Sequence, residues 1–303
     1  MKKVLITGGA GTVGSSFIKK YYNNYKFYNF SRGEEQIAEL SRNYPKVKNI
    51  IGDINNLSQL INIFESIKPD IVIHAAALKH VNIAELNPSQ TVENNIVGSL
   101  NVVKASVRAK VPITVGISTD KACAPENVYG YSKKMMEMIF MEHYNSSTKF
   151  VCTRFANVAN SKGSVIPYWK GLVQEKKPLQ LTDPNMNRLM FSKEDSSILI
   201  HYAIESAYKS KKPFIISKIM NTVNMLDLAK SMSDNINIVG SRPGEKVNED
   251  LISKKEIPFT KVEDEYIFLF NEIQDKEHNL TQPHSSLTAK KMSKDQLTKL
   301  INS

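Results

Sequence analysis

This chain has few cysteines and no long apolar run, and each of these features argues against a class of protein: disulfide-rich secreted proteins in the first case and membrane proteins in the second. Among 303 residues only Cys123 and Cys152 are cysteines, too few for a disulfide framework, which predicts a reducing compartment. The apolar run Val4–Ile6 near the N-terminus is far shorter than the roughly 7–15 residues of a secretory signal core. No run approaches the roughly 20 apolar residues of a membrane span. These absences predict a cytoplasmic protein with no membrane partner.

Runs of like charge are also missing, although the chain is basic. It has 40 Lys and Arg against 30 Asp and Glu, a formal net charge of +10. The lysines occur as scattered pairs such as Lys133-Lys134 rather than as a cluster. A nucleic-acid interface needs a basic stripe or a docking motif, so no nucleic-acid partner is predicted. A diffuse positive field suits an anionic nucleotide ligand instead.

The first half of the chain alternates between strand-like and helical segments. Strands are expected at 3–6, 26–30, 47–51, 71–75, 111–118 and 149–156, and helices at 13–22, 34–41, 57–67, 89–109 and 129–145. This order predicts an α/β fold, a doubly wound parallel Rossmann sheet. Ligands of such sheets bind beyond the carboxyl ends of the strands. The residues at or just past these ends, which we expect to meet in one crevice, are Gly8, Asp53, Ala75, Ser118, Thr119 and Asn157.

The second half of the chain is predicted to form shorter helices and strands, because prolines such as Pro167 are expected to interrupt it. Short strands are predicted near 179–182, 214–218, 236–239 and 265–270. Ser192 with Asp195 forms a capping box for a helix near 193–208, and Ser293 caps a last helix near 294–302. The predicted division is a Rossmann domain of residues 1–160, to which 191–218 return, and a smaller C-terminal substrate-binding lobe of 161–190 and 219–303.

A glycine motif follows the first strand and opens the first helix. Its spacing, Gly8-x-x-Gly11-x-x-Gly14, has one residue more in the first gap than the commonest dinucleotide motif. Glycines allow a tight turn and a close approach to a pyrophosphate, whose charge the helix N-terminus attracts. The residues expected to bind the cofactor here are Gly8, Gly11, Thr12, Val13 and Gly14.

Tyr129 and Lys133 lie one helical turn apart and point the same way. Free tyrosine has a pKa near 10, so a base near neutral pH needs a shift of about three units, roughly 4 kcal/mol. The Lys133 ammonium and an oxidised nicotinamide would supply positive charge for that shift. Thr119 completes an arrangement for oxidising a secondary alcohol. Asp120 and Lys121 add a second acid/base pair, which plain alcohol oxidation does not require.

The end of the second strand bears on the choice of cofactor. NAD enzymes usually have Asp or Glu there, but this strand runs into Ser31-Arg32. Ser31 and Arg32 suit a 2′-phosphate and favour NADP, while the acidic residues at 34–35 keep NAD as the alternative. Asp53 is expected to cap the adenine, unless it only closes a turn. Further expected cofactor contacts are Ile54, Ala75, Ala76 and Lys79, besides Tyr129 and Lys133.

Six motifs occur in order along the chain: Thr-Gly-Gly-Ala-Gly-Thr-Val-Gly (7–14), His-Ala-Ala-Ala-Leu-Lys-His-Val (74–81), Ser-Thr-Asp-Lys-Ala (118–122), Tyr-Gly-Tyr-Ser-Lys (129–133), Gly-Ser-Val-Ile-Pro (163–167) and Arg-Pro-Gly-Glu-Lys (242–246). Together they resemble the extended short-chain dehydrogenase/reductases that act on nucleotide sugars. Within that group the sequence is similar to the UDP-N-acetylglucosamine 4,6-dehydratases of polysaccharide biosynthesis, especially the C5-inverting kind.

The resemblance implies a hydro-lyase reaction on a UDP-N-acetylhexosamine with an internally recycled cofactor and no metal. Tyr129, helped by Thr119 and Lys133, would take the C4 hydroxyl proton while a hydride leaves C4. Lys121 would then remove the C5 proton, and Asp120 would protonate the departing C6 hydroxyl. The hydride returns to C6, and C5 is reprotonated on the opposite face. These roles need Lys121 neutral and Asp120 protonated, so each is expected to have a shifted pKa in a desolvated site.

Substrate contacts are also implied by the resemblance. The UDP diphosphate would be held by Asn157 and Arg242, with support from Arg188, and the uridine ribose by Glu245. Val165 and Pro167 would flank the uracil, and Lys79 and His80 would line the nicotinamide end. Three alternatives stay open: a plain turn at 242–244, a surface ion pair for Arg188 and a structural role for His80.

Several positions depart from the family pattern. Tyr131, Ala156 and Asn160 replace smaller residues, and the Trp often found after Arg188 is missing. The missing Trp, together with the segment Ser132–Glu137, leans toward related dehydratase/5-epimerases, so the C5 outcome stays open. Alternative functions are a UDP-sugar 4-epimerase, which needs no C5 base, and an NADP-binding regulator, which the intact Tyr-Lys pair disfavours. A homo-oligomer is expected, with helices 89–109 and 129–145 at its interface.

Overall fold

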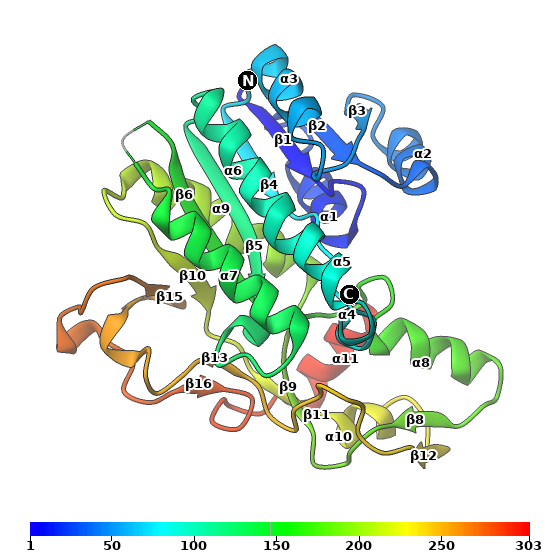
Figure 1. Ribbon diagram of the computed structural model, residues 1–303. Helices are drawn as coiled ribbons and strands as arrows, with labels where there is room; N and C mark the ends of the chain where they lie inside the picture. The colour runs from blue at the N-terminus through cyan, green and yellow to red at the C-terminus, as the bar shows by residue number, and fades with distance from the viewer. Residues whose placement is uncertain (146) are drawn as a thin grey trace.

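A computed structural model describes residues 1–145 and 147–303, and its centre is a large, mostly parallel sheet (Figure 1). In this described part the sheet has nine strands in the order β14-β15-β10-β6-β5-β4-β1-β2-β3. The strands of the first half are β1 (Lys3–Thr7), β2 (Lys26–Ser31), β3 (Lys48–Ile51), β4 (Ile71–His74), β5 (Ile113–Thr119) and β6 (Lys149–Phe155). The order 3-2-1-4-5-6 is that of a doubly wound dinucleotide-binding sheet, and it confirms the predicted fold class.

Helices cover both faces of this sheet. They are α1 (Thr12–Tyr21), α2 (Glu34–Asn43), α3 (Leu57–Ile67), α6 (Gly98–Arg108), α7 (Val128–Glu142) and α9 (Lys193–Lys209). Along β1, Val4 and Ile6 pack in one cluster with Phe17 of α1, and Leu5 packs in another with Phe64 of α3. Alternate residues of a strand face opposite sides, so an unbroken apolar run such as Val4–Ile6 of β1 is buried by helices on both sides.

The predicted helix 89–109 is continuous but not uniform. It consists of α5 (Pro88–Thr91), a π-helical segment η1 (Val92–Val97) and α6, and it follows a short helix α4 (Val81–Leu86) that the sequence did not predict. Single π-helical turns often occur at functional sites. Here the turn contains Asn95, whose side chain bonds both the N–H and the C=O of Leu78, at 2.8 and 2.9 Å.

The chain after residue 156 builds a second core and also returns to the sheet. The lobe contains β7 (Asn157–Val158), α8 (Val165–Gln174), β8 (Leu179–Leu181), β9 (Asn187–Phe191), β11 (Thr222–Asn224), α10 (Met225–Lys230), β12 (Ile236–Ile238) and α11 (Lys294–Asn302). Trp169, Leu181 and Leu228 lie at the centre of its apolar cluster. The capping boxes at Ser192 and Ser293 are confirmed.

Pro167 does not break the chain as predicted, because it lies in the first turn of α8, where a helix does not use the missing N–H. β10 (Ile215–Lys218) pairs with β6, and β15 (Tyr266–Leu269) and β14 (Thr260–Glu263) extend the sheet in antiparallel fashion. The last two strands lie within the range that the sequence analysis assigned to the lobe.

Five short elements complete the described part of the chain: the 3₁₀ turns η2 (Asp120–Ala122), η3 (Ile257–Phe259) and η4 (Lys276–His278), and the paired strands β13 (Asp250–Ile252) and β16 (His284–Ser285). No helix within 1–145 and 147–303 is both long enough and apolar enough to cross a bilayer.

Candidate active site

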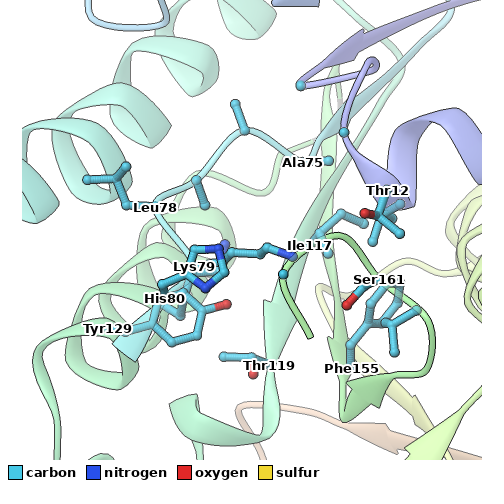
Figure 2. A pocket seen from close by; sticks show the side chains of 18 of the residues that line it. Thr12, Ala75, Leu78, Lys79, His80, Ile117, Thr119, Tyr129, Phe155 and Ser161 are labelled. Carbon is cyan, nitrogen blue, oxygen red and sulfur yellow. The ribbon is translucent and has the colours of Figure 1, made fainter. Parts of the chain in front are cut away.

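A cavity of about 750 Å³ lies at the carboxyl ends of the parallel strands. The loops after β1, β2, β4, β5 and β6 line one side of it, and residues of the lobe line the other. Figure 2 shows side chains that face the cavity from α1, from the loop after β4, from the end of β5 and from α7, namely Thr12, Lys79, Thr119 and Tyr129. The structure therefore brings together most of the residues that the sequence analysis singled out, with Asp53, Val165 and Pro167 outside the lining.

The glycine turn after β1 leaves no room for side chains. Gly8 has φ of +74°, and a Cβ on it would lie 2.8 Å from the backbone N of Ala76. A Cβ on Gly14 would lie 2.5 Å from Cα of Gly9, so α1 can approach the turn closely. No side chain caps the first turn of α1, whose free N–H groups are therefore left for an anion.

Ser31 and Arg32 lie farther along the cavity, where β2 ends. The Arg32 guanidinium is half-exposed and pairs with the Asp53 carboxylate at 3.3 Å. Asp53 also accepts a hydrogen bond from the N–H of Asn55, which closes a turn. Asp53 is thus a turn residue and a partner of Arg32, and it lies outside the cavity lining.

Thr119, Asp120 and Lys121 follow one another where β5 passes into η2. Asp120 Oδ1 accepts three hydrogen bonds: from Thr119 Oγ1 at 2.8 Å, from the Lys121 N–H at 2.9 Å and from Lys121 Nζ at 3.1 Å. Asp120 is 1% exposed. Burial opposes the charge on Lys121, but the carboxylates of Asp120 and Glu249 outweigh it and raise the pKa of the amine. The expected neutral Lys121 is therefore not its resting form.

Tyr129 and Lys133 lie on the first two turns of α7, which begins with Asn127 capping the N–H of Gly130 at 2.7 Å. Burial raises the pKa of the Tyr129 phenol to about 12, and Asp120 adds to this while Lys121 opposes it. Burial also lowers the pKa of Lys133 to about 8. Its ammonium donates to Met136 Sδ at 3.0 Å. In the protein alone desolvation dominates, and the lowering expected with an oxidised nicotinamide in place stays a prediction.

Lys79 and His80 enter the cavity from the loop after β4, which Asn95 holds through Leu78. Lys79 Nζ donates to the carbonyl of Lys162 at 2.7 Å and so ties this loop to the loop before α8. Burial lowers the pKa of both side chains, and the Lys79 charge lowers that of His80 further.

The lobe contributes Asn157, Arg188, Arg242 and Glu245 to the lining. Arg188 is 7% exposed and is no surface residue. Its guanidinium donates to the carbonyls of Asn187, Val247 and Lys246 at 2.7–3.0 Å. Glu245 accepts from the N–H of Arg242 at 3.1 Å, so 242–245 does form a turn, and this turn borders the cavity.

Val165 and Pro167, two of the predicted substrate contacts, lie outside the cavity lining, and their contact with uracil stays a prediction. Both lie in the first turn of α8, and Val165 packs against the core of the lobe. The residues just before the helix, 161–164, do line the cavity. The helix α8 begins at Val165 and packs its apolar face, with Ile166 and Trp169, into the lobe.

Glu249 is a cavity residue that the sequence analysis missed. The residue is 1% exposed, and its carboxylate lies 3.5 Å from Lys121 Nζ. Nothing in its local sequence marks it, since one more Glu after the 242–246 motif reads as a loop charge. The only available signal is the Leu251-Ile252 pair that follows, which indicates a buried strand next to it.

A second buried charge cluster adjoins the first along β5 and β6, where Ser118 and Arg154 are register partners. Arg154, with no exposed surface, donates to both oxygens of Glu137 at 3.0 and 2.8 Å and to Glu256 at 3.1 Å. Ser118 Oγ donates to Glu137 at 2.7 Å. This cluster joins the segment after β13 to the sheet directly beside Thr119.

Comparison with known proteins agrees with these features. Residues 4–271 match the family model described as polysaccharide biosynthesis protein. Over 271 residues the chain is 36% identical to the UDP-N-acetylglucosamine 4,6-dehydratase (inverting) of Campylobacter jejuni, covering 86% of the chain and 80% of the relative. It is 34% identical over 279 residues to the UDP-glucose 4-epimerase of Rickettsia bellii, covering 87% and 80%.

Among solved structures, Pen from Bacillus thuringiensis superposes with a TM-score of 0.91 at 30% identity, covering 99% of this chain and 97% of that one. The resemblance drawn from the six motifs is confirmed by these relatives. The chain belongs to the polysaccharide biosynthesis protein family.

Proposed function

We propose that this protein is an NADP-dependent lyase that dehydrates UDP-N-acetylglucosamine to a UDP-4-keto-6-deoxy-hexosamine, with inversion at C5, for surface-glycan biosynthesis. The observation that carries the proposal is the buried hydrogen bond between Lys121 Nζ and Asp120 Oδ1, 3.1 Å, in the cavity that also holds Thr119 and Tyr129. Oxidation at C4 requires only Thr119, Tyr129 and Lys133. A second acid/base pair is what loss of water from C5 and C6 requires.

The cavity residues fit a dinucleotide. The pyrophosphate would lie on the turn of Gly8 and Gly11 and on the uncapped N-terminus of α1. Ser31 and Arg32 would hold a 2′-phosphate in place of the Arg32–Asp53 pair, which supports NADP over NAD. When bound, the nicotinamide would accept a hydride from C4 and return it at C6.

Tyr129 is the group that would take the C4 hydroxyl proton. Burial keeps its phenol protonated, so an oxidised nicotinamide and a Lys133 ammonium turned from Met136 toward the cofactor ribose must supply the positive charge that favours the phenolate. Thr119 would orient the same hydroxyl. In this proposal Tyr129 becomes a base only when the cofactor is in place.

Lys121 and Asp120 would set each other's protonation state. Transfer of one proton along their 3.1 Å hydrogen bond turns the ammonium into an amine and the carboxylate into an acid. The amine can then take the C5 proton, and the acid can protonate the departing C6 hydroxyl, so water leaves. The pair returns to ammonium and carboxylate, and the net charge of the site is unchanged.

Asn157 and Arg242 would contact the UDP diphosphate, and Glu245 the uridine ribose. Arg188 would support the diphosphate site indirectly. Its guanidinium already donates to the backbone carbonyls at 246–247, next to the turn that carries Arg242. Lys79 and His80 would close the sugar end of the cavity.

A homo-oligomer is also proposed, through the outer faces of α4, η1 and α7. Large apolar side chains are exposed on these elements, namely Ile83, Leu86, Val92, Val97, Met135 and Met138, together with Tyr131. Light scattering on the purified protein measures the mass directly, and a monomer would contradict this part. The predicted cytoplasmic location stays a prediction.

The experiment that tests the function is mass spectrometry of UDP-N-acetylglucosamine incubated with the protein and NADP in deuterated water. The expected product has lost one water and carries deuterium at C5, and NMR of the same sample reads the C5 configuration. A substrate that keeps its mass and takes up no deuterium would contradict dehydration.

A UDP-sugar 4-epimerase is the second candidate, favoured by the relatives that carry this name. Epimerisation would use Thr119, Tyr129 and Lys133, and it would give Asp120 and Lys121 no catalytic role. Epimerisation keeps the mass and converts UDP-N-acetylglucosamine or UDP-glucose to its C4 epimer, which chromatography separates.

A further inference from the structure

We propose that Glu249 is a positioning residue for Lys121: from the lobe it supplies a second carboxylate that holds the amine in the reacting position and sets its charge together with Asp120. The inference rests on the proposed dehydration, in which Lys121 is the C5 base. Lys121 Nζ lies 3.1 Å from Asp120 Oδ1 and 3.5 Å from Glu249 Oε1, and the two carboxylate side chains are 1% and 2% exposed.

The unpaired oxygens of this cluster point to a role beyond stability. Within residues 1–145 and 147–303, Asp120 Oδ2 and Glu249 Oε2 are both buried without a hydrogen-bond partner. Leaving a buried charged oxygen unpaired costs stability, and natural proteins rarely tolerate it without a functional reason. Both residues line the cavity, so these oxygens are available to a proton or a substrate hydroxyl.

The backbone of Glu249 is held on both sides, which makes its position fixed rather than adaptive. Its N–H donates to Ser286 Oγ at 2.9 Å, and its carbonyl accepts from the Ser286 N–H at 2.8 Å. Before it, Arg188 holds the carbonyls at 246–247, and after it Glu256 is bonded to Arg154 of the sheet. The lobe thus delivers one carboxylate to the end of β5.

The charges around Lys121 explain what this carboxylate does. Asp120, Glu249 and Arg188 act on the amine, and Lys246 also acts on Glu249. Burial raises the pKa of Glu249, the Lys121 ammonium opposes this, and the two carboxylates in turn raise the pKa of Lys121. Removing the charge of Glu249 therefore makes Lys121 lose its proton at lower pH, and it frees the amine to move away from the C5 position.

Glu249→Gln tests the charge without changing the size of the side chain. The fall of kcat at high pH should begin at lower pH than in the wild type, because the Lys121–Asp120 pair loses its shared proton more readily. Glu249→Asp keeps the charge but shortens the reach, so it should keep the wild-type midpoint while kcat falls by about 10²-fold through misplacement. Glu263→Gln, in an exposed pair with Lys261 on β14, is the matched control and should follow the wild-type profile.

A second readout does not depend on turnover. In protein with ¹³C-labelled lysine, the Lys121 signal is assigned by its loss in Lys121→Met and titrated without substrate. It should titrate at lower pH in Glu249→Gln than in the wild type. An unchanged Lys121 titration, or the same kcat profile for Glu249→Gln as for the wild type, would overturn the inference. If the titration moves but the wild type never dehydrates UDP-N-acetylglucosamine, the pairing stands and the proposed function fails.

Discussion

Two buried charge clusters lie side by side in this protein, and each has one buried cation between two carboxylates. One of them also includes the partly exposed Lys134, whose ammonium lies 3.6 Å from Glu137 and 3.8 Å from Glu256. Around Arg154 the carboxylates are Glu137 and Glu256, and around Lys121 they are Asp120 and Glu249. In both, one carboxylate comes from the Rossmann half and the other from the segment 249–256. The two clusters therefore share their burial, their composition and their connection between the lobe and the sheet.

The clusters differ in how completely their hydrogen bonds are made. The Arg154 guanidinium uses its planar fork on both carboxylates and on the carbonyl of Leu251, and Glu256 also accepts from the N–H of Ser253. Lys121 cannot do the same with a single ammonium, and one oxygen each of Asp120 and Glu249 stays unpaired in the part of the chain that is described. Saturated buried charges hold a fold together, whereas unsaturated ones facing a cavity are suited to move protons.

Replacing Lys121 should have the largest effect, because it tests whether the Lys121 cluster moves protons. Lys121→Arg keeps a cation between the two carboxylates but cannot give up a proton, so dehydration and C5 deuterium exchange should fall by about 10²–10⁴-fold. Cofactor binding and the unfolding transition should stay close to those of the wild type. Product mass, deuterium uptake and NADP binding are measured on the same preparation.

Lys121→Ala removes the cation as well and should also abolish exchange and dehydration while NADP still binds. Turnover unchanged in either variant would remove Lys121 from the mechanism. Unfolding of both variants would instead make the Lys121 cluster structural, like the other one.

Arg154→Met is the next largest change and should act on stability. It leaves Glu137 and Glu256 with only the partly exposed Lys134, at 3.6 and 3.8 Å, as a cation. Removing one partner of a buried pair costs about 3–5 kcal/mol of unfolding free energy. Denaturant unfolding followed by circular dichroism measures this loss. Stability equal to that of the wild type would show that the saturated cluster is not what holds the segment 249–256 to the sheet.

Glu256 gives the same cluster a pH dependence. Burial alone would raise the pKa of this carboxyl, but Arg154, with hydrogen bonds from Cys123 and Ser253, lowers it from 4.5 to about 2. A folded-state pKa below the unfolded one gives stability above pH 4.5 that is lost as pH falls toward 2, about 3 kcal/mol in all.

Glu256→Gln should therefore be less stable than the wild type at pH 6, with a difference that shrinks as pH falls from 4.5 toward 2. The buried His74 and His284, whose pKa values burial lowers to about 3 and about 4, also weaken the fold in acid, but equally in both proteins. Unfolding curves at several pH values give the difference. A constant difference would mean that the carboxyl does not titrate with the cluster.

The sequence was enough to predict what depends on neighbouring residues. The period-2 and period-3.6 patterns of the first half predict strands and helices that lie within a few residues of the observed ones, and the Ser192–Asp195 box predicts the start of α9. Thr119–Lys121 and Tyr129/Lys133 were found because each set sits on one strand end or one helix turn. Pro167 misled the analysis, since its meaning depends on where the helix begins.

What could not be predicted depends on contacts between distant parts of the chain. Glu249 reaches Lys121 only because the lobe folds back over β5, and the π-helical turn at Asn95 depends on a hydrogen bond to Leu78 in another loop. The upward shift of the Tyr129 pKa in the protein alone could not be predicted for the same reason. Burial of the phenol is a property of the packed cavity, and it outweighs the charges that the sequence places nearby.

Replacing Arg32 should have the smallest effect on stability, and it extends the comparison of the two buried clusters to an exposed ion pair. Its pair with Asp53 has side chains 52% and 40% exposed, so it should contribute less than about 1 kcal/mol to stability, unlike the pairs of Arg154. Its predicted role is to contact a 2′-phosphate, and a charged hydrogen bond lost there should weaken NADP by roughly 10–100-fold while NAD is little affected. Titration of both cofactors into Arg32→Ala measures this, with thermal unfolding as the stability readout. Equal losses for NADP and NAD would contradict the 2′-phosphate assignment, because NAD lacks the group that Arg32 is proposed to bind.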